Sequence, residues 1–306
     1  MMEGNYNSFQ PRPELPAQSI ARVVSPARRA AKRQRSAPVF AVTSGKGGVG
    51  KTNVVANLAT ALARRQQRVM AIDADLGLAN LDLFLGIKPQ YSLADFFAGA
   101  ATLDEIIVTN REGILIMPGA SGVQEITALR HEQKAAFLTE LDLLTLDMDV
   151  VLVDTGSGIS DAVTYFTSAA QEIILVVTPE PSSMTDAYAL VKVLRAQHGQ
   201  QRFLVLANNV SDGAEGRRLF DALSRTALRF LNVSLDFLDW IPRDPKLLSA
   251  AARAQTVVTD NTDAPSTRAF MNVADQLLQR ASVQAKLKGN LQFFFRRMLE
   301  GGKAGQ

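Results

Sequence analysis

Short apolar runs alternate with longer segments of mixed apolar and polar residues between residue 39 and about residue 242 of this 306-residue chain. Within the runs, apolar residues occupy successive positions rather than every second one, which indicates strands that are buried on both faces. The runs cover residues 39–43, 69–73, 114–118, 150–154, 172–178, 202–208 and 235–241. Such strands, separated by helical segments, predict an α/β fold: a doubly wound, mostly parallel sheet of seven to eight strands with helices on both faces.

The two ends of the chain differ from this body in composition. Residues 1–38 contain five of the twelve prolines and seven Lys or Arg against two Glu, which predicts a flexible basic tail. Residues 39–285 carry 21 basic and 27 acidic side chains, and residues 286–306 carry five and one. We therefore divide the chain into a tail (1–38), one α/β domain (39–283) and a basic C-terminal segment (284–306).

Helical spacing in the C-terminal segment separates an apolar stripe from basic residues. The basic side chains of Lys286, Arg296 and Arg297 fall opposite the stripe. The stripe consists of Leu287, Leu291, Phe294, Phe295, Met298 and Leu299. This arrangement suits a helix that lies on an anionic membrane surface. Docking of the same helix on the protein's own core or on a protein partner is the alternative, which periodicity alone leaves open.

Composition excludes several kinds of site. The chain has no cysteine, so disulfides, iron-sulfur clusters and thiolate zinc sites are excluded, in agreement with a reducing compartment. Its two histidines, His131 and His198, lie far apart in sequence and indicate no metal site. No run reaches the ~18 apolar residues that cross a bilayer, and no apolar signal-peptide core follows the first residues. We expect a cytoplasmic protein that at most binds the inner membrane surface peripherally.

One motif carries most of the chemistry. An apolar strand (39–43) runs into a glycine-rich loop that fits the pattern G-x-x-x-x-G-K-[ST], and a helical segment (53–63) follows. Backbone N–H groups of such a loop converge on phosphates; Lys51 would reach the β and γ phosphates and Thr52 would bind Mg²⁺. The predicted nucleotide-binding residues are Gly45, Lys46, Gly47, Gly48, Val49, Gly50, Lys51, Thr52 and Asn53.

Polar residues follow three of the predicted strands, where ligands of doubly wound sheets bind. Asp154 ends an apolar run in the Walker B form, in which the carboxylate supports the coordination of Mg²⁺. Asp75 is the candidate for orienting and deprotonating an attacking water, and Asp73 is suited to support the metal from outside its first ligand sphere. Capping of a turn or helix is the structural alternative for Asp73 and Asp75.

Together, the two-lysine loop, the run Asp73–Asp82 and the Asp154 strand resemble the deviant Walker A ATPases of the MinD/ParA group, over residues 39 to about 280. Within that group the chain is similar to the FlhG/FleN-type regulators of flagellar number. The segments that carry this similarity are Leu76–Asp82, Ala169–Val177, Thr185–Leu190 and Leu206–Asn209.

The resemblance implies ATP hydrolysis with Mg²⁺ and an ATP-bound homodimer. It implies that Lys46 reaches the triphosphate held by the partner subunit, that Asp75 activates water, that Asp154 is linked to Mg²⁺ and that Asn208 reads adenine. It further implies a C-terminal membrane-targeting helix that is released when ATP binds. Implied partners are a flagellar transcription activator, components of the flagellar C-ring and an FlhF-type GTPase.

Two segments depart from the family's pattern. Ala17–Arg22 matches poorly the N-terminal D-Q-A-x-x-L-R element that stimulates the FlhF-type GTPase. The second switch reads Asp154-Thr155-Gly156-Ser157-Gly158 where alanine or proline is more common, and we expect the extra glycine to loosen this segment.

Other classes of protein that share the two-lysine loop agree with this sequence to different degrees. Carrier ATPases that need cysteines are excluded, and bacterial tyrosine kinases do not fit because no tyrosine follows Tyr188. A ParA-type partition ATPase that holds DNA remains an alternative, although the acidic body argues against direct DNA binding. A transcriptional co-regulator that uses ATP as a conformational ligand is a further alternative, which can coexist with flagellar control.

Overall fold

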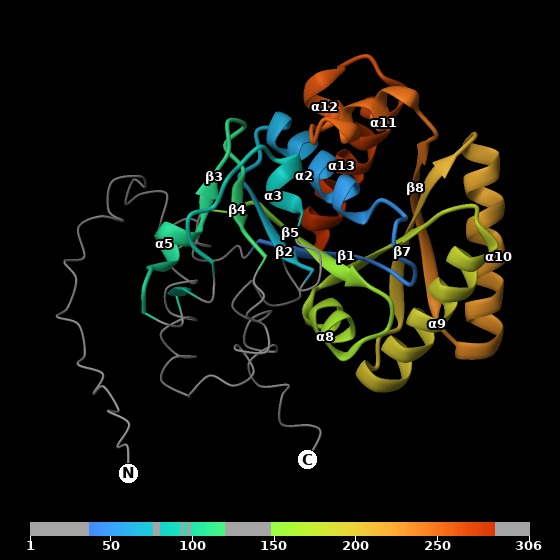
Figure 1. Cartoon of the computed structure of the whole chain (residues 1–306). Helices are drawn as coiled ribbons and strands as arrows, with labels where there is room; N and C mark the ends of the chain where they lie inside the picture. Colours follow the sequence, from blue (N-terminus) through green and yellow to red (C-terminus); the bar gives the residue numbers. More distant parts are fainter. Residues whose placement is uncertain (1–36, 76–79, 93–94, 97–98, 120–147, 285–306) are drawn as a thin grey trace, which may run out of the picture. The chain divides into compact units, whose positions relative to one another are not determined.

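The computed structural model describes residues 37–75, 80–92, 95–96, 99–119 and 148–284, all within one unit, 35–306. These residues form one eight-stranded sheet in the order β3-β4-β2-β5-β1-β6-β7-β8 (Figure 1). All neighbouring strands are parallel except β3, which pairs with β4 in the antiparallel sense. The α/β, mostly parallel sheet predicted from the apolar runs is therefore confirmed.

Each of the seven apolar runs forms a strand, and one short strand was not predicted. The strands are β1 (Val39–Ser44), β2 (Val69–Ala74), β3 (Val108–Thr109), β4 (Leu115–Met117), β5 (Val150–Ser157), β6 (Glu172–Val177), β7 (Arg202–Val210) and β8 (Ser234–Pro242). Every residue of β1 and β2 is buried. This burial on both faces explains why the runs lack the alternation of an exposed strand.

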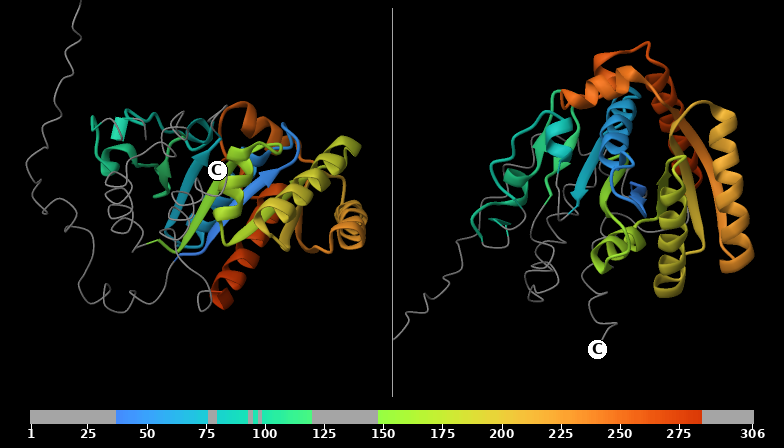
Figure 2. Two further views of the ribbon diagram at one scale, coloured as in Figure 1. Left: turned by 90° about the horizontal axis from the view of Figure 1, so that it is seen from below. Right: turned by 45° about the vertical axis from the view of Figure 1, so that its right-hand side comes forward.

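Helices cover both faces of the sheet. They are α2 (Lys51–Arg64), α3 (Leu81–Phe84), α5 (Leu103–Ile106), α8 (Asp161–Ala169), α9 (Pro181–His198), α10 (Gly213–Leu231), α11 (Pro245–Ala252), α12 (Val257–Asp260) and α13 (Pro265–Gln284). In the right-hand view of Figure 2, α9 and α10 stand next to each other at one end of the sheet, and α11 and α12 lie across the top.

Successive side chains of β1 pack into hydrophobic cores on opposite faces of the sheet. Phe40 and Val42 pack with α2 and α13, whereas Val39 and Ala41 pack with α5 and α8. A third core holds α9 and α10 against β6 and β7. Helix α2 is buried almost all round, because it lies between the sheet and α13. The helix that follows the glycine-rich loop is thus fixed by packing on several sides.

The glycine-rich loop follows β1, at the point where the order of strand addition reverses. β1 lies between β5 and β6: the chain places β2 to β5 on one side of β1 and then crosses to the other side, where it adds β6, β7 and β8. Ligands of doubly wound sheets bind at this switch point, beyond the carboxyl ends of the strands. Pairing of β2 with β5 sets Asp73 directly beside Asp154.

The predicted ends of the domain can be compared with the described residues only in part. Ala37 is buried and the Pro38 carbonyl accepts a hydrogen bond from the Val151 N–H, so these two residues of the predicted tail already contact the sheet. Residues 1–36 and the predicted membrane stripe at 287–299 lie outside the described residues. Among the helices that the structure describes, none combines the length and apolar character needed to cross a bilayer.

Candidate nucleotide-binding site

The loop between β1 and α2 depends on two glycines with positive φ. Gly48 has a φ of 77° and Gly50 a φ of 90°, a conformation that other residues adopt only with strain. A side chain at Gly50 would also meet the Asn208 amide at 2.8 Å. Gly50 is the N-cap residue of α2 and has no side chain with which to cap the first turn. The N–H groups of that turn are therefore available to an anion.

Gly45 is required for a different reason. A Cβ atom there would lie 2.1 Å from backbone atoms of Asp186 on α9. Helix α9 therefore contacts the start of the loop, and its first turn lies close to Lys46. The sequence predicted a phosphate-binding role for Gly45, and the structure adds this packing constraint.

Lys51, Asp73, Asp75 and Asp154 come together at the carboxyl edge of β1, β2 and β5. Lys51 is buried, and burial lowers its pKa, while the charges of Asp154 and Asp75 raise it. A buried ammonium group beside carboxylates can pair with the negative charge of an incoming phosphate. The structure thus brings together the residues that the sequence assigned to phosphate and metal binding.

The Asp154 carboxylate is buried, and no hydrogen bond of normal geometry reaches it from the described residues. It is 1% exposed, and neither carboxylate oxygen has a hydrogen-bond partner within the described part of the chain. Burial and the neighbouring charge of Asp73 raise the pKa of Asp154 to about 8, although the Thr52 hydroxyl and Lys51 favour the charged form. A buried, unpaired carboxylate beside a threonine hydroxyl fits a Mg²⁺ held by few protein oxygens, water and phosphate.

No larger cluster of metal ligands is found: the described residues contain no group of three or more His, Cys, Asp or Glu side chains that could enclose a metal ion. A Mg²⁺ that arrives with a nucleotide keeps several of its waters and needs few protein ligands. Thr52 and Asp154 are the residues that fit such an ion.

Asp73 holds the backbone of the segment that follows β2. One carboxylate oxygen accepts the Asp75 N–H at 3.0 Å, and the other accepts the N–H groups of Asn80 and Leu81 at 3.1 and 3.2 Å. Burial raises the pKa of Asp73 to about 6, against these hydrogen bonds. These contacts match the structural alternative, capping of a turn and of the start of α3. Asp73 thereby fixes where Asp75 leaves the strand.

Asp75 lies over Gly156, where a Cβ atom would be 3.6 Å from its carboxylate. β5 continues through Gly156 to Ser157, with a shift of register against β1 between Val42 and Ser44. Ser157 pairs with Ser44, and the Gly158 N–H donates to the Ser44 carbonyl at 3.0 Å. A Cβ atom at Gly156 would also meet Val163 at 3.1 Å. The glycine is therefore needed for close packing at this irregular part of the strand.

Lys46 is bound within its own chain. Its ammonium group donates to the Glu180 carboxylate and, at 2.8 Å, to the Ser182 hydroxyl, at the start of α9. The side chains of Lys46 and Glu180 are 34% and 56% exposed. An ion pair this exposed is worth only ~0–1 kcal/mol, so a triphosphate can compete for the lysine. This contact was not predicted from the sequence.

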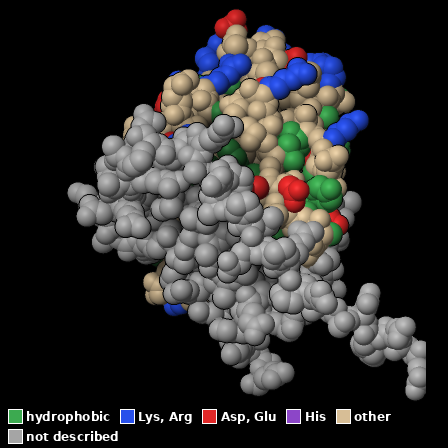
Figure 3. All heavy atoms as spheres, turned by 90° about the vertical axis from the view of Figure 1, so that its left-hand side faces the viewer, with side chains coloured by type: hydrophobic (Ala, Val, Ile, Leu, Met, Phe, Trp, Pro, Cys, Tyr) green, Lys and Arg blue, Asp and Glu red, His purple; other side chains and the backbone are tan. Residues whose placement is uncertain are grey.

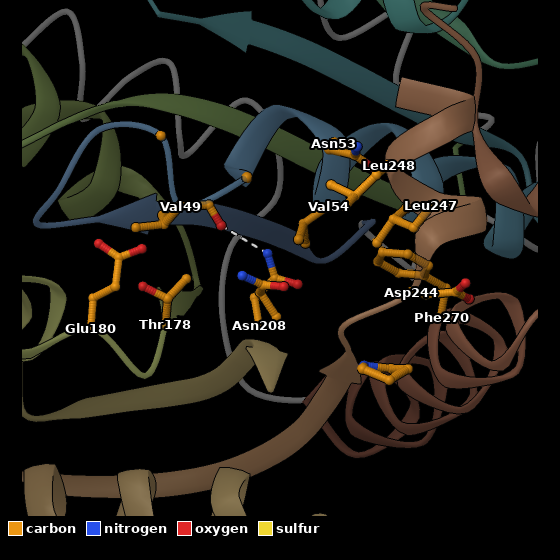
Figure 4. Close-up of a pocket in the computed structure, with 14 residues that line it drawn as sticks. Val49, Asn53, Val54, Thr178, Glu180, Asn208, Asp244, Leu247, Leu248 and Phe270 are labelled. Atoms are coloured by element: carbon orange, nitrogen blue, oxygen red, sulfur yellow. Dashed lines mark hydrogen bonds between the residues drawn. The ribbon is translucent and has the colours of Figure 1, made fainter. Parts of the chain in front are cut away.

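A cavity of about 140 Å³ adjoins the loop (Figure 4). The Asn208 amide donates to the Val49 carbonyl at 2.8 Å, which leaves its buried carbonyl oxygen without a partner among the described residues. The Thr178 hydroxyl, also in the cavity wall, is buried and likewise unpaired in that part of the chain. An unpaired amide oxygen can accept a hydrogen bond from an exocyclic amino group such as that of adenine.

The far wall of this cavity comes from the C-terminal part of the fold. Leu247 and Leu248 of α11 and Phe270 of α13 face Asn208 across the cavity (Figure 4). Asp244 anchors both helices, because it accepts the Lys246 N–H at 2.9 Å and the Ser266 hydroxyl at 2.6 Å. Apolar walls with few polar groups are typical of a pocket for a base. No local motif marks this wall in the sequence, and it was not predicted.

Comparison with known proteins places this geometry among nucleotide-binding proteins. The family described as "CobQ/CobB/MinD/ParA nucleotide binding domain" matches residues 40–257. The chain is 43% identical to the antiactivator FleN of Pseudomonas aeruginosa over 267 residues, which cover 87% of this chain and 95% of FleN. It is 37% identical to the flagellum site-determining protein YlxH of Helicobacter pylori over 188 residues, 61% of this chain and 63% of YlxH.

Among solved structures, the chain is similar to the septum site-determining protein MinD of Pyrococcus horikoshii, which was solved with Mg-ADP. The TM-score is 0.62 at 25% identity, with 82% of this chain and all of that chain covered. The similarity extends to a protein that holds a magnesium nucleotide, the ligand that Thr52 and Asp154 fit here.

Replacement of Asp154 by asparagine should stabilise the protein when nucleotide and Mg²⁺ are absent. The folded carboxyl keeps its proton up to about pH 8, whereas an unfolded aspartate loses it near pH ~3.9. Stability of the wild type therefore falls as pH rises through this window. We expect Asp154→Asn to raise the melting temperature by several degrees at pH 8.5 and by less at pH 5.5.

Asp221→Asn, at an exposed carboxylate on α10, is the control and should give no such pH-dependent gain. An equal change in melting temperature for Asp154→Asn at both pH values would contradict the assigned cause.

Proposed function

Because this chain belongs to the CobQ/CobB/MinD/ParA family of nucleotide-binding proteins, we propose that it is an ATPase switch that dimerises with ATP and regulates flagella. The observation that supports the ATPase assignment best is the buried, unpaired Asp154 carboxylate beside Thr52 and Lys51. Bound Mg²⁺ would neutralise charge on the β and γ phosphates, with Thr52 and Asp154 as its protein contacts.

In the proposed ATP state, backbone N–H groups of residues 47–52 and the Lys51 ammonium bind the phosphates. The base occupies the cavity between Asn208 and α11, with its amino group on the Asn208 oxygen. Asp75 orients the attacking water and takes its proton, while Asp73 keeps the backbone at Asp75 in place. Asp75 is suited to this role because it is only partly buried, so water can approach it.

Lys46 connects nucleotide binding to dimerisation. In the single chain its charge is satisfied by Glu180 and Ser182. In the proposed dimer it leaves this weak contact and donates to the triphosphate held by the partner subunit, where excess negative charge makes the exchange favourable. ADP offers less charge at that position, so hydrolysis would return Lys46 to Glu180 and release the partner.

The proposed output is the number or placement of flagella. It rests on the similarity to proteins named as an antiactivator and as a flagellum site-determining protein. A flagellar transcription activator, C-ring components and an FlhF-type GTPase are the partners that we propose to test first. On the face shown in Figure 3, Lys and Arg side chains gather along the upper rim. The acidic excess of residues 39–285 as a whole makes the alternative of a DNA partition ATPase less favoured.

We further propose that the protein is cytoplasmic and binds the inner membrane surface peripherally when ATP is bound. The residues for this contact are the apolar stripe Leu287, Leu291, Phe294, Phe295, Met298 and Leu299. The proposal rests on the pattern of these residues and on the basic side chains opposite them.

Variants of Lys46 and Glu180 should change dimerisation in opposite directions. With a non-hydrolysable ATP analogue, Lys46→Ala should sediment as a monomer. Glu180→Gln frees the lysine and should lower the protein concentration at half-dimerisation, by up to about fivefold per subunit. Analytical ultracentrifugation measures both. Glu112→Gln at the exposed β3–β4 turn is the control, and a Lys46→Ala dimer as stable as the wild type would contradict the role of Lys46.

Replacement of Asp75 by alanine should abolish turnover and trap the dimer. Loss of a general base costs a factor of ~10² to 10⁴ in rate, while the groups that bind ATP remain. Phosphate release and sedimentation with ATP should show a stable dimer without hydrolysis. Asp82→Ala, in the same acidic segment, serves as the control. Undiminished turnover in Asp75→Ala would reject the assignment.

Membrane association should depend on the C-terminal stripe. In co-sedimentation with anionic vesicles and ATP, the wild type should pellet and Phe294→Glu/Phe295→Glu should remain in the supernatant, because two charges oppose insertion of the stripe. Equal pelleting of both proteins would contradict the membrane role of this segment.

A further inference from the structure

The last residue of β5, Ser157, carries a hydroxyl group that lies against the phosphate loop. Ser157 pairs with Ser44, the last residue of β1, and the loop begins directly after Ser44. A Cβ atom at Gly47 would lie 3.4 Å from the Ser157 Oγ atom. The hydroxyl is therefore placed beside the loop, next to a glycine that lies between the two lysines Lys46 and Lys51.

Within the described part of the chain, this hydroxyl has no role in the fold. Ser157 is the one exposed residue of β5, and no hydrogen bond joins its hydroxyl to another described residue. Neighbouring donors are used differently. The Ser44 hydroxyl donates to the Lys46 carbonyl at 2.7 Å, and the Gly158 N–H donates to the Ser44 carbonyl at 3.0 Å. Of these three donors, the Ser157 hydroxyl is the one that a ligand can use.

The order of the strands places this hydroxyl at the end of the site where the terminal phosphate belongs. The base cavity is walled by Asn208, near the end of β7, and it touches the loop at residues 48–50 (Figure 4). β5, which carries Asp154, and β2, which leads to Asp75, lie on the other side of β1. A nucleotide whose base fills the cavity therefore extends its phosphates away from β7, across the loop and toward the end of β5.

Ser157 also lies close to the residue assigned to water activation. Its neighbour Gly156 lies beneath the Asp75 carboxylate, since a Cβ atom at Gly156 would be 3.6 Å from the Asp75 Oδ1 atom. The end of β5 therefore connects Asp75 with the loop at Gly47. A hydroxyl group at this position can donate a hydrogen bond to an oxygen of a terminal phosphate.

We propose that Ser157 distinguishes ATP from ADP, because its hydroxyl donates a hydrogen bond to an oxygen of the terminal phosphate, which ADP lacks. The assignment rests on the proposed ATPase function and adds to it a residue that reads the state of the nucleotide. Hydrogen bonds to charged groups are stronger than those between neutral groups, so this contact favours the triphosphate by about tenfold. Since Ser157 and the loop belong to the same chain, this discrimination precedes dimerisation.

Competition against a fluorescent ADP measures the affinities of the full-length protein at nanomolar concentrations, where it is monomeric. With Mg²⁺ present, Ser157→Ala should bind ADP as tightly as the wild type does and a non-hydrolysable ATP analogue about tenfold more weakly. Ser157→Thr keeps the hydroxyl group and should retain the wild-type ratio of the two affinities. Ser234→Ala, at an exposed serine that begins β8, is the matched control and should change neither affinity.

An equal loss of affinity for ADP and for the analogue in Ser157→Ala would overturn the proposal, because it would show that the serine supports only the shape of the loop. Unchanged affinity for both nucleotides would overturn it as well. Failure of the wild type to bind either magnesium nucleotide would instead overturn the proposed function on which the inference rests.

Turnover supplies a second readout. A hydrogen bond that is present with bound ATP and in the transition state alike lowers KM and leaves kcat unchanged. Ser157→Ala should therefore raise the KM for ATP about tenfold, with kcat close to that of the wild type and an unchanged melting temperature. A fall of kcat at an unchanged KM would contradict a contact between Ser157 and bound ATP.

Discussion

The charge of Lys46 must be neutralised close to the phosphate loop, and this constraint connects nucleotide binding with assembly. In the single chain the charge is met by Glu180 and Ser182 at the start of α9, through a contact that is half open to solvent. Since Gly45 lets the backbone of α9 approach the loop, the same close packing brings this contact within reach. Because this contact is weak, a triphosphate can replace Glu180 as the partner of the Lys46 ammonium group.

A second group of charges gives the site its dependence on metal. Asp73 and Asp154 are neighbours on adjacent parallel strands, and both are buried, with Lys51 close to Asp154. Burial raises the pKa of Asp73 to about 6 and that of Asp154 to about 8, so near neutral pH the site without a cation holds a proton on Asp154, where a magnesium nucleotide would supply positive charge. Burial of the unpaired Asp154 carboxylate costs free energy of folding, and the packing of α2 on the sheet offsets this cost. Stability is thus reduced at the position that the proposed chemistry needs.

Features encoded in local sequence could be predicted, and features created by tertiary contacts could not. Seven strands were predicted because burial on both faces leaves continuous apolar runs, whereas β3 is two residues long and half-exposed, so no run marks it. The phosphate loop was visible because its glycines and lysines are adjacent in sequence. The partner of Lys46 lies 134 residues away, and the base pocket needs α11 and α13 folded back over Asn208. No single segment carries these signals.

The central claim is that Lys46 acts on the nucleotide of the other subunit, and a mixing experiment tests it most directly. Lys46→Ala keeps a complete pocket but lacks the crossing lysine, whereas Lys51→Ala keeps Lys46 but loses nucleotide binding; each alone should be inactive. Since neither variant dimerises alone, every dimer in a 1:1 mixture contains one subunit of each kind and one complete site of two, so turnover should recover to at most about half of the wild type. A mixture that stays at the background of the two separate variants would contradict the account.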